Sequence, residues 1–150
     1  MANSWDVHIK LSRADFSSLG LGDKHFRIVA DLGDVFEVCH DEGGHRGEEF
    51  REFLDANSIV YLGSHGTGYD HGCADFASGG ERCLEHATNP DGFYVVPAYR
   101  EGNIDPGNPS LLTEYIDFRG TVAAKLGLCS CCDLSPEKCR TLAEIEPPGR

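Results

Sequence analysis

The segment at residues 47–68 constrains the fold most, because it combines an amphipathic helix, a buried strand and a glycine-rich loop in direct succession. Phe53 and Leu54 follow Phe50 by three and four positions among charged side chains, which is typical of the apolar face of a helix. A continuous apolar run at residues 58–62 predicts a buried strand, and glycines follow it. This order of elements indicates an α/β domain.

Three further strands and a long helix complete the expected domain. Apolar and polar residues alternate at residues 7–11, which is the period-two pattern of a half-buried strand. Strands are also expected at residues 26–30 and 35–39, where a Gly-Asp turn joins them as a hairpin. A helix is expected from Asn108, which suits an N-cap, to Gly127. We therefore predict a single α/β domain with a mixed β-sheet, an N-terminal hairpin and flanking helices.

The sequence of the second half of the chain predicts shorter helices and strands. Gly79 and Gly80 each lower helical preference by roughly 1 kcal/mol, so we expect only a short helix at residues 81–87. An apolar run at residues 93–96 predicts a second buried strand, and a final helix is expected from Ser135 to about Ile145. Residues 1–127 form the expected core, and residues 128–150 form a Cys-rich C-terminal loop and helix.

Composition and charge argue against several classes of partner. The chain of 150 residues has 25 acidic and 13 basic residues, and its formal charge of −12 repels phosphate backbones and anionic membranes. Because its arginines are scattered, we expect neither nucleic acid nor a membrane as a partner. No apolar run approaches the roughly 20 residues that cross a bilayer, and residues 1–10 lack the pattern of a secretory signal. We expect a cytoplasmic protein whose seven cysteines are kept reduced.

Side chains that could bind a metal are most concentrated near the C-terminus. Four cysteines lie within eleven residues, namely Cys129, Cys131, Cys132 and Cys139. They span the junction between two expected helices, and a loop followed by a helix can aim three or four thiolates at one ion, as in small zinc sites. Asp133 could add an oxygen ligand. We therefore predict that this cluster binds zinc or another transition metal.

Two other interpretations of this cysteine cluster stay open. Cys129, Cys132 and Cys139 could be small buried apolar residues where the chain returns to the core. Alternatively, the cluster could be redox-active, because a thiol near a helix N-terminus has a lowered pKa and a neighbouring thiol can resolve its oxidised form.

The loop after residues 58–62 is a second candidate site. Ligands of open α/β sheets bind at the carboxyl ends of strands, where such loops lie. Its glycines would let backbone amides approach an anion, and its hydroxyl groups would donate hydrogen bonds. The chain lacks both the Walker and the dinucleotide-binding glycine patterns, so no nucleotide site is predicted. The residues expected to contact a ligand are Gly63, Ser64, Gly66, Thr67 and Gly68.

The same loop also carries a mixed set of nitrogen and sulfur ligands. His65, His71 and Cys73, which His40 or His45 could join, would suit zinc, copper or iron. An incomplete protein ligand set leaves a position for water, and metal-bound water can ionise near pH 7. A metal-dependent hydrolase is therefore one expectation.

A thiol hydrolase is the alternative expectation. The segment at residues 72–77, Gly-Cys-Ala-Asp-Phe-Ala, resembles the Asn-Cys-x-x-Phe-Ala segment of permuted papain-like thiol hydrolases, although it lacks the asparagine. The resemblance implies that Cys73 is the nucleophile at the start of a helix and that His25 accepts its proton; His65 could also be the base. A non-catalytic interaction module, whose cysteines only hold the fold, is the third alternative.

Two shorter resemblances point to metallocofactors. Residues 60–68 look like the strand and His-Gly-Thr loop of cobalt and iron chelatases. The order of hairpin, helix, strand and glycine loop is similar to that of proteins that carry the nitrogenase iron-molybdenum cofactor. We assign the chain to neither family. Both use histidine beside a metal or metallocofactor, so the prediction from sequence is a protein that binds one of these.

Overall fold

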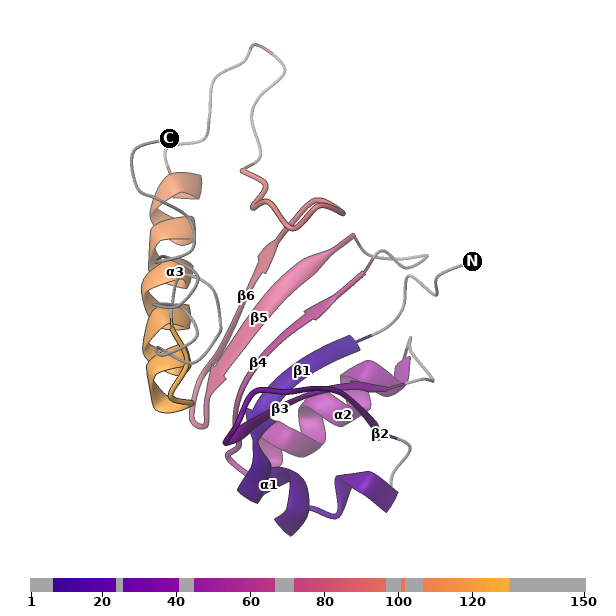
Figure 1. Cartoon of the computed structure of the whole chain (residues 1–150). Coiled ribbons are helices and arrows are strands. Elements are labelled where there is room, and N and C mark those ends of the chain that lie inside the picture. The colour runs from indigo at the N-terminus through magenta and orange to yellow at the C-terminus, as the bar shows by residue number, and fades with distance from the viewer. Residues whose placement is uncertain are drawn as a thin grey trace, which may run out of the picture.

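Six strands form one open antiparallel sheet in the order β2-β3-β1-β4-β5-β6 (Figure 1). The computed structural model describes residues 7–23, 26–40, 45–66, 72–96, 101 and 107–129. Its elements are, in chain order, β1 (Val7–Ser12), α1 (Arg13–Ser18), η1 (Leu21–Asp23), β2 (Phe26–Asp31), β3 (Val35–His40), α2 (His45–Ala56), β4 (Val60–His65), β5 (Ala74–Gly79), β6 (Cys83–Ala87) and α3 (Gly107–Lys125).

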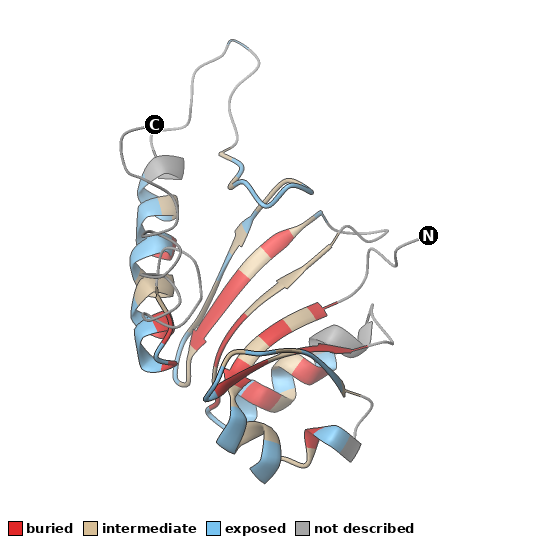
Figure 2. Cartoon of the chain, in the orientation of Figure 1, coloured by how far each residue is buried: buried red, intermediate tan, exposed pale blue. Residues whose placement is uncertain are grey.

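The strands divide their side chains between two apolar layers. In β1, Val7, Ile9 and Leu11 are buried on the face covered by α2, whereas His8 and Lys10 project toward the opposite face, because successive residues of a strand alternate. We name these the α2 face and the α3 face. Figure 2 shows buried positions on the central strands and on the sheet-facing sides of the helices.

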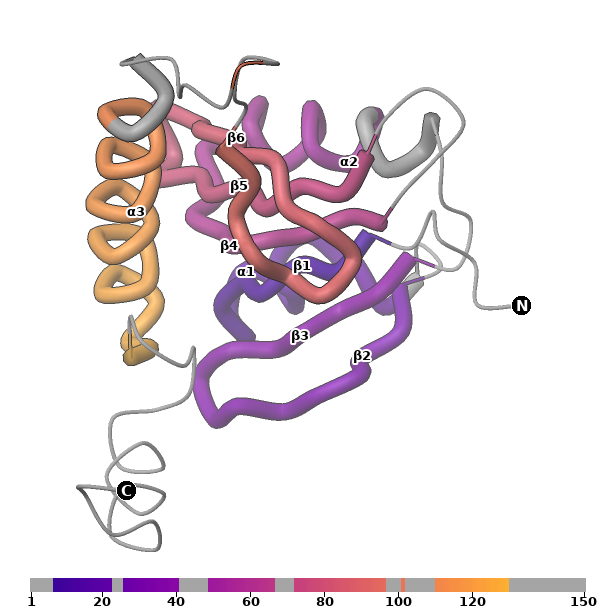
Figure 3. The backbone as a smooth tube through the Cα atoms, turned by 90° about the horizontal axis from the view of Figure 1, so that it is seen from above, coloured from indigo at the N-terminus to yellow at the C-terminus, as the bar shows by residue number. Residues whose placement is uncertain are grey.

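Each layer contains one long helix. Figure 3 shows α2 and α3 lying apart, each against a different side of the strands. Fully burying one aliphatic or aromatic side chain contributes about 1.5–3 kcal/mol, so both layers stabilise the sheet. The α2 layer contains Val7, Ile9, Leu11, Leu21, Phe36, Val38, Phe50, Leu54, Ile59, Tyr61 and Phe76. The α3 layer contains Val35, Leu62, Ala77, Tyr115, Val122, Ala123, Leu126 and Leu128.

The α/β class, the N-terminal hairpin and the flanking helices predicted from the sequence are confirmed. The expected mixture of strand directions is not found, because every pairing between the described strands is antiparallel. Antiparallel neighbours need only short connections, and β2 and β3 are joined through Gly33, whose φ of 98° favours glycine.

The short helix expected at residues 81–87 is wrong, because this segment forms β6 and pairs with β5. Gly80 and Glu81 make the two-residue turn between them, and the φ of Gly80 is 96°. Glycine at the first position of such a turn is typical of type II′ hairpins. The strand expected at residues 93–96 is reduced to one isolated bridge between Thr88 and Tyr94.

The C-terminal helix expected at residues 135–145 lies outside the described residues. Within the described ranges, no helix is long and apolar enough to cross a membrane.

Candidate functional site

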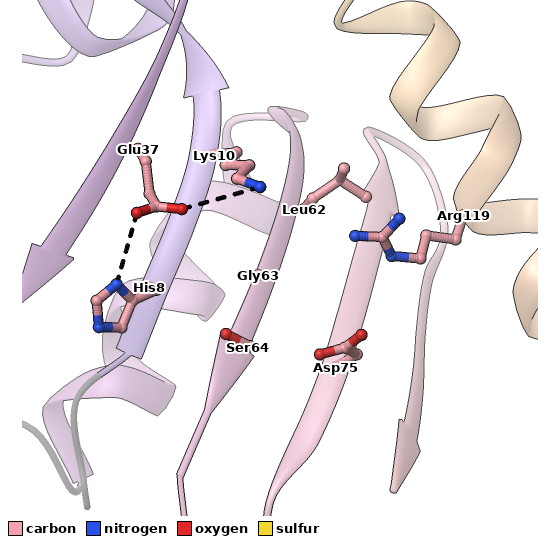
Figure 4. Close-up of a pocket in the computed structure, with 8 residues that line it drawn as sticks. All are labelled: His8, Lys10, Glu37, Leu62, Gly63, Ser64, Asp75 and Arg119. Atoms are coloured by element: carbon pink, nitrogen blue, oxygen red, sulfur yellow. Dashed lines mark ion pairs between the residues drawn. The ribbon is translucent and has the colours of Figure 1, made fainter. Parts of the chain in front are cut away.

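A cavity of about 160 Å³ lies on the α3 face, where side chains from β1, β3, β4, β5 and α3 converge (Figure 4). Leu62, Gly63 and Ser64 of β4 line its centre, and charged side chains flank it on both sides. Its described lining residues are His8, Lys10, Glu37, Leu62, Gly63, Ser64, Asp75 and Arg119.

The wall formed by β1 and β3 carries three titratable side chains. Lys10 and Glu37 are directly opposite in the antiparallel pairing, and Lys10 Nζ lies 3.8 Å from Glu37 Oε1. His8 lies two residues earlier on the same face, with Nδ1 4.0 Å from Glu37 Oε2. Their side chains are 22–43% exposed, so this ion-pair group is open to solvent and accessible to a ligand.

The opposite wall is formed by β5 and α3. Figure 4 shows Arg119 reaching from α3 toward β5, above Asp75. The Tyr94 hydroxyl donates a hydrogen bond of 3.2 Å to Asp75 Oδ2. Tyr115 lies one helical turn before Arg119, and both Asp75 and Arg119 influence its pKa electrostatically. Burial, and then the carboxylate of Asp75, raise the pKa of Tyr115.

Tyr115 has an unsatisfied hydroxyl group. Its side chain is buried, and in the part of the chain that the structure describes its hydroxyl proton has no acceptor, although the Arg119 guanidinium is close enough to lower its pKa as a hydrogen-bond donor. A buried donor without a partner loses its hydration and gains nothing in return. Tyr115 does not itself line the cavity, but its charged neighbours Asp75 and Arg119 do, so its unsatisfied hydroxyl lies close to two lining residues.

A second cavity, of about 340 Å³, adjoins the first, and His8, Ser64 and Asp75 line both. It lies at the end of β4 and extends over the turn that follows β6. Its other described lining residues are His65, Gly66, Cys73, Thr88, Asn89, Pro90 and Gly92. We name the two adjoining cavities together the crevice.

His65 belongs to a separate charged cluster on the α2 face. Its Nε2 lies 3.7 Å from Glu85 Oε1, and Arg51 Nη1 donates to the same oxygen at 2.8 Å. The Arg51 guanidinium lies 3.8 Å from the centre of the Phe76 ring, a cation–π contact. The ion pair with His65, and then Arg51, lower the pKa of Glu85 to about 2, while Glu85 raises the pKa of His65.

The predicted ligand loop is partly a strand. Because β4 continues to His65, Gly63 and Ser64 lie within the sheet, and Gly66 follows it. Gly63 has a packing role, since a Cβ atom there would overlap the Phe76 ring. Gly63 therefore contacts an aromatic ring on the α2 face, and Gly63, Ser64 and Gly66 all line the crevice. Thr67 and Gly68 lie outside the described residues.

The predicted metal sites are only partly described. Among the described residues, no group of three or more His, Cys, Asp or Glu side chains could hold a metal ion. His65 and Cys73 both line the second cavity, but His71 lies outside the described ranges. Cys129 is half-buried just after α3, and Cys131, Cys132 and Cys139 are not described.

The helix that the thiol-hydrolase resemblance implies after Cys73 is wrong, because residues 74–79 form β5. The partial positive charge of a helix N-terminus is what would activate a nucleophile at this position, and a strand does not supply it. One ring nitrogen of His65 faces Glu85, and the other lies 3.1 Å from the Gly66 carbonyl oxygen. Any role of His65 as the base of Cys73 therefore competes with these two contacts. His25 lies outside the described residues.

Comparison with known proteins gives no match: no family model, no curated protein and no solved structure. The assignment of the candidate site therefore depends on the geometry of its residues alone.

Sequence reasoning missed the charged residues of the crevice, His8, Lys10, Glu37, Asp75 and Arg119. Two signals were present. Two polar positions that alternate with apolar residues in β1 are the titratable His8 and Lys10, and Glu37 is the one acidic residue within β3. The pairing of β1 with both β3 and β4 that brings them together is not visible in the sequence.

Proposed function

We propose that the protein binds a small polar molecule in the crevice. The observation that supports this most is the presence of a cation and an anion on each of two walls, Lys10 with Glu37 and Arg119 with Asp75, facing each other across Ser64. Charged side chains set around a concave, partly buried surface are the groups that orient a polar ligand.

The size and charge of the first cavity limit the ligand. Its volume of about 160 Å³ is below the roughly 300–1,000 Å³ of sites for drug-sized molecules, so the part of the ligand held between the charged walls is small and any larger part extends into the second cavity. Lys10 and Arg119 balance Glu37 and Asp75, so the cavity is locally neutral in a chain whose formal charge is −12. The charge of the cavity therefore differs from that of the acidic chain as a whole, as is expected of a surface whose charges complement those of a ligand.

Ligand-detected NMR tests this function. Saturation transfer is measured from the protein to pools of amino acids, small mono- and dicarboxylic acids, diamines and monosaccharides. We expect at least one pool to bind, and its signal to fall with Asp75→Asn while remaining with Asp117→Asn, a matched change at an exposed position of α3. Absence of transfer from every pool, or transfer that is equal in both variants, would contradict the proposal.

Metal binding by the C-terminal cysteines is the second candidate function. Its structural support is the position of Cys129, which follows Leu126 and Leu128 of the α3 layer and is therefore held beside the folded core. We propose that Cys129, Cys131, Cys132 and Cys139 bind zinc or another transition metal in a reducing compartment such as the cytoplasm.

Metal content tests the second candidate separately. Protein purified without added metal is analysed by mass spectrometry for bound transition metals. We expect close to one equivalent, lost in Cys131→Ser and retained in Cys39→Ser, because Cys39 is buried in β3. A metal-free wild-type protein with reduced thiols would contradict metal binding and leave the crevice proposal unaffected.

A further inference from the structure

We infer that the ligand of the crevice is a free α-amino acid, bound by its ammonium and carboxylate groups at Asp75 and Arg119. This inference rests on the proposed ligand-binding function and names the chemical class of the ligand. It is argued from the order of charges on the two walls, from their spacing and from the unsatisfied hydroxyl of Tyr115.

The charge order disfavours ligands with a single kind of charge. A dicarboxylate bound at Arg119 would bring negative charge beside Asp75, and a diamine bound at Asp75 would bring positive charge beside Arg119. Like charges brought together at a binding surface weaken binding, so both classes are selected against. A zwitterion carries both charges and can pair with Asp75 and Arg119 on one wall.

The spacing favours a zwitterion whose charges are close together. Strands β1 and β5 are separated by β4, so the two walls start roughly 10 Å apart at the backbone, which is two strand spacings. Asp75 and Arg119 instead lie on the same wall, next to each other in Figure 4. The ammonium and carboxylate of an α-amino acid are attached to one carbon atom and can meet this pair together.

Arg119 and Tyr115 provide the carboxylate end of the site. A guanidinium group can bind a carboxylate through two parallel hydrogen bonds. The buried Tyr115 hydroxyl has Asp75 and Arg119 as its charged neighbours, and its proton lacks a described acceptor. A carboxylate bound at Arg119 would accept a hydrogen bond from this hydroxyl and so satisfy it.

Asp75 provides the ammonium end. Its Oδ2 accepts a hydrogen bond from Tyr94, which holds the carboxylate in position on β5. Asp75 also lines both cavities, so the side chain of the bound amino acid can extend past Ser64 into the second cavity. The second cavity, with Thr88, Asn89 and Pro90 in its lining, would then select among amino acids.

Isothermal titration calorimetry with blocked derivatives tests the inference. The probes are the tightest-binding free amino acid, its α-amide and its N-acetyl form, each of which removes one charge. Since a hydrogen bond to a charged group is lost in each case, both derivatives should bind about tenfold more weakly or worse. Asp75→Asn should weaken the free amino acid by a similar factor, and Asp117→Asn should not.

The outcomes separate this inference from the proposed function. If dicarboxylates, diamines or monosaccharides bind through Asp75 and amino acids do not, the crevice binds ligands but the inference is wrong. If the α-amide and N-acetyl derivatives bind as tightly as the free amino acid, the inference is also wrong. If no probe binds, both are wrong. NMR spectra of each variant establish that it remains folded.

Discussion

The ring of Phe76 on β5 occupies the space above Gly63 on β4 that any larger side chain would need. The two residues are directly paired across the strands, and Phe76 is fully buried. A glycine in a strand interior weakens the strand but permits the close approach of a neighbouring aromatic ring. Gly63 is therefore explained by packing, although its position in a glycine-rich segment suggests ligand binding.

Gly63→Ala should destabilise the protein by about 1–3 kcal/mol, because the added methyl group overlaps a ring in a closely packed layer. Gly72→Ala is the matched control, since a Cβ atom there has open space around it. Unfolding in urea measures both. Equal stabilities for the two variants would show that the Phe76 ring does not restrict position 63.

The two buried tyrosines Tyr61 and Tyr115 should respond in opposite ways to removal of the hydroxyl. Tyr61 donates a hydrogen bond of 2.8 Å to Asp55 Oδ1, whereas the Tyr115 hydroxyl lacks a described acceptor. Tyr61→Phe should therefore destabilise the ligand-free protein by about 1 kcal/mol, and Tyr115→Phe should stabilise it by a similar amount. Thermal unfolding compares them. A loss of stability in Tyr115→Phe equal to that in Tyr61→Phe would show that the hydroxyl is already satisfied.

The ion pair between His65 and Glu85 should make stability depend on pH. Glu85 raises the pKa of His65 above 6.5, so this contribution is present below pH 6.5 and is lost as the pH rises through the folded-state pKa. His65 and Arg51 lower the pKa of Glu85 from 4.5 to about 2, so that contribution is present above pH 4.5 and is lost as the pH falls toward 2. Both contributions are present between pH 4.5 and 6.5.

Glu85→Gln should therefore lose the most stability, relative to the wild type, between pH 4.5 and 6.5. The difference should narrow at higher pH without vanishing, because Arg51 still pairs with Glu85 when His65 is neutral. Urea unfolding across the pH range measures it, and Glu52→Gln, an exposed change on α2, is the control. A difference that does not vary with pH would show that His65 does not interact with Glu85 in solution.

The thiol-hydrolase hypothesis predicts a reactive Cys73. At about pH 6 an ordinary thiol, with a pKa of about 8.5, is almost entirely protonated and reacts slowly with iodoacetamide. Selective modification of Cys73 over the half-buried Cys83, followed by peptide mass spectrometry, would support this hypothesis. Equal, slow labelling of both cysteines would contradict it.

The elements with strong local patterns were predictable from the sequence. The stripe of Phe50, Phe53 and Leu54 predicts α2, and alternation predicts β1, because both patterns follow directly from the geometry of one element. By contrast, β5 contains alanine, aspartate, serine and glycine and shows no alternation, because it lies between β4 and β6 and is partly covered on both faces. The pairing of β5, and therefore the formation of β6 beside it, depends on neighbouring strands that the local sequence does not reveal.

The crevice was not predictable for the same reason. Lys10 and Glu37 meet through the pairing of β1 with β3, and Arg119 reaches β5 only because α3 packs across the sheet. Conversely, Ser64 and His65 are adjacent in sequence but alternate across β4, so only Ser64 lies between the charged walls, although both line the second cavity at the end of the strand.

Chemical-shift mapping of the backbone amides during titration with the pool of free amino acids tests ligand binding in the crevice most directly. The account predicts saturable shifts at His8, Ser64 and Asp75, which line both cavities, and their loss in Asp75→Asn. Shifts that gather instead around Arg51 and Glu85 on the α2 face, or no shifts at all, would contradict it.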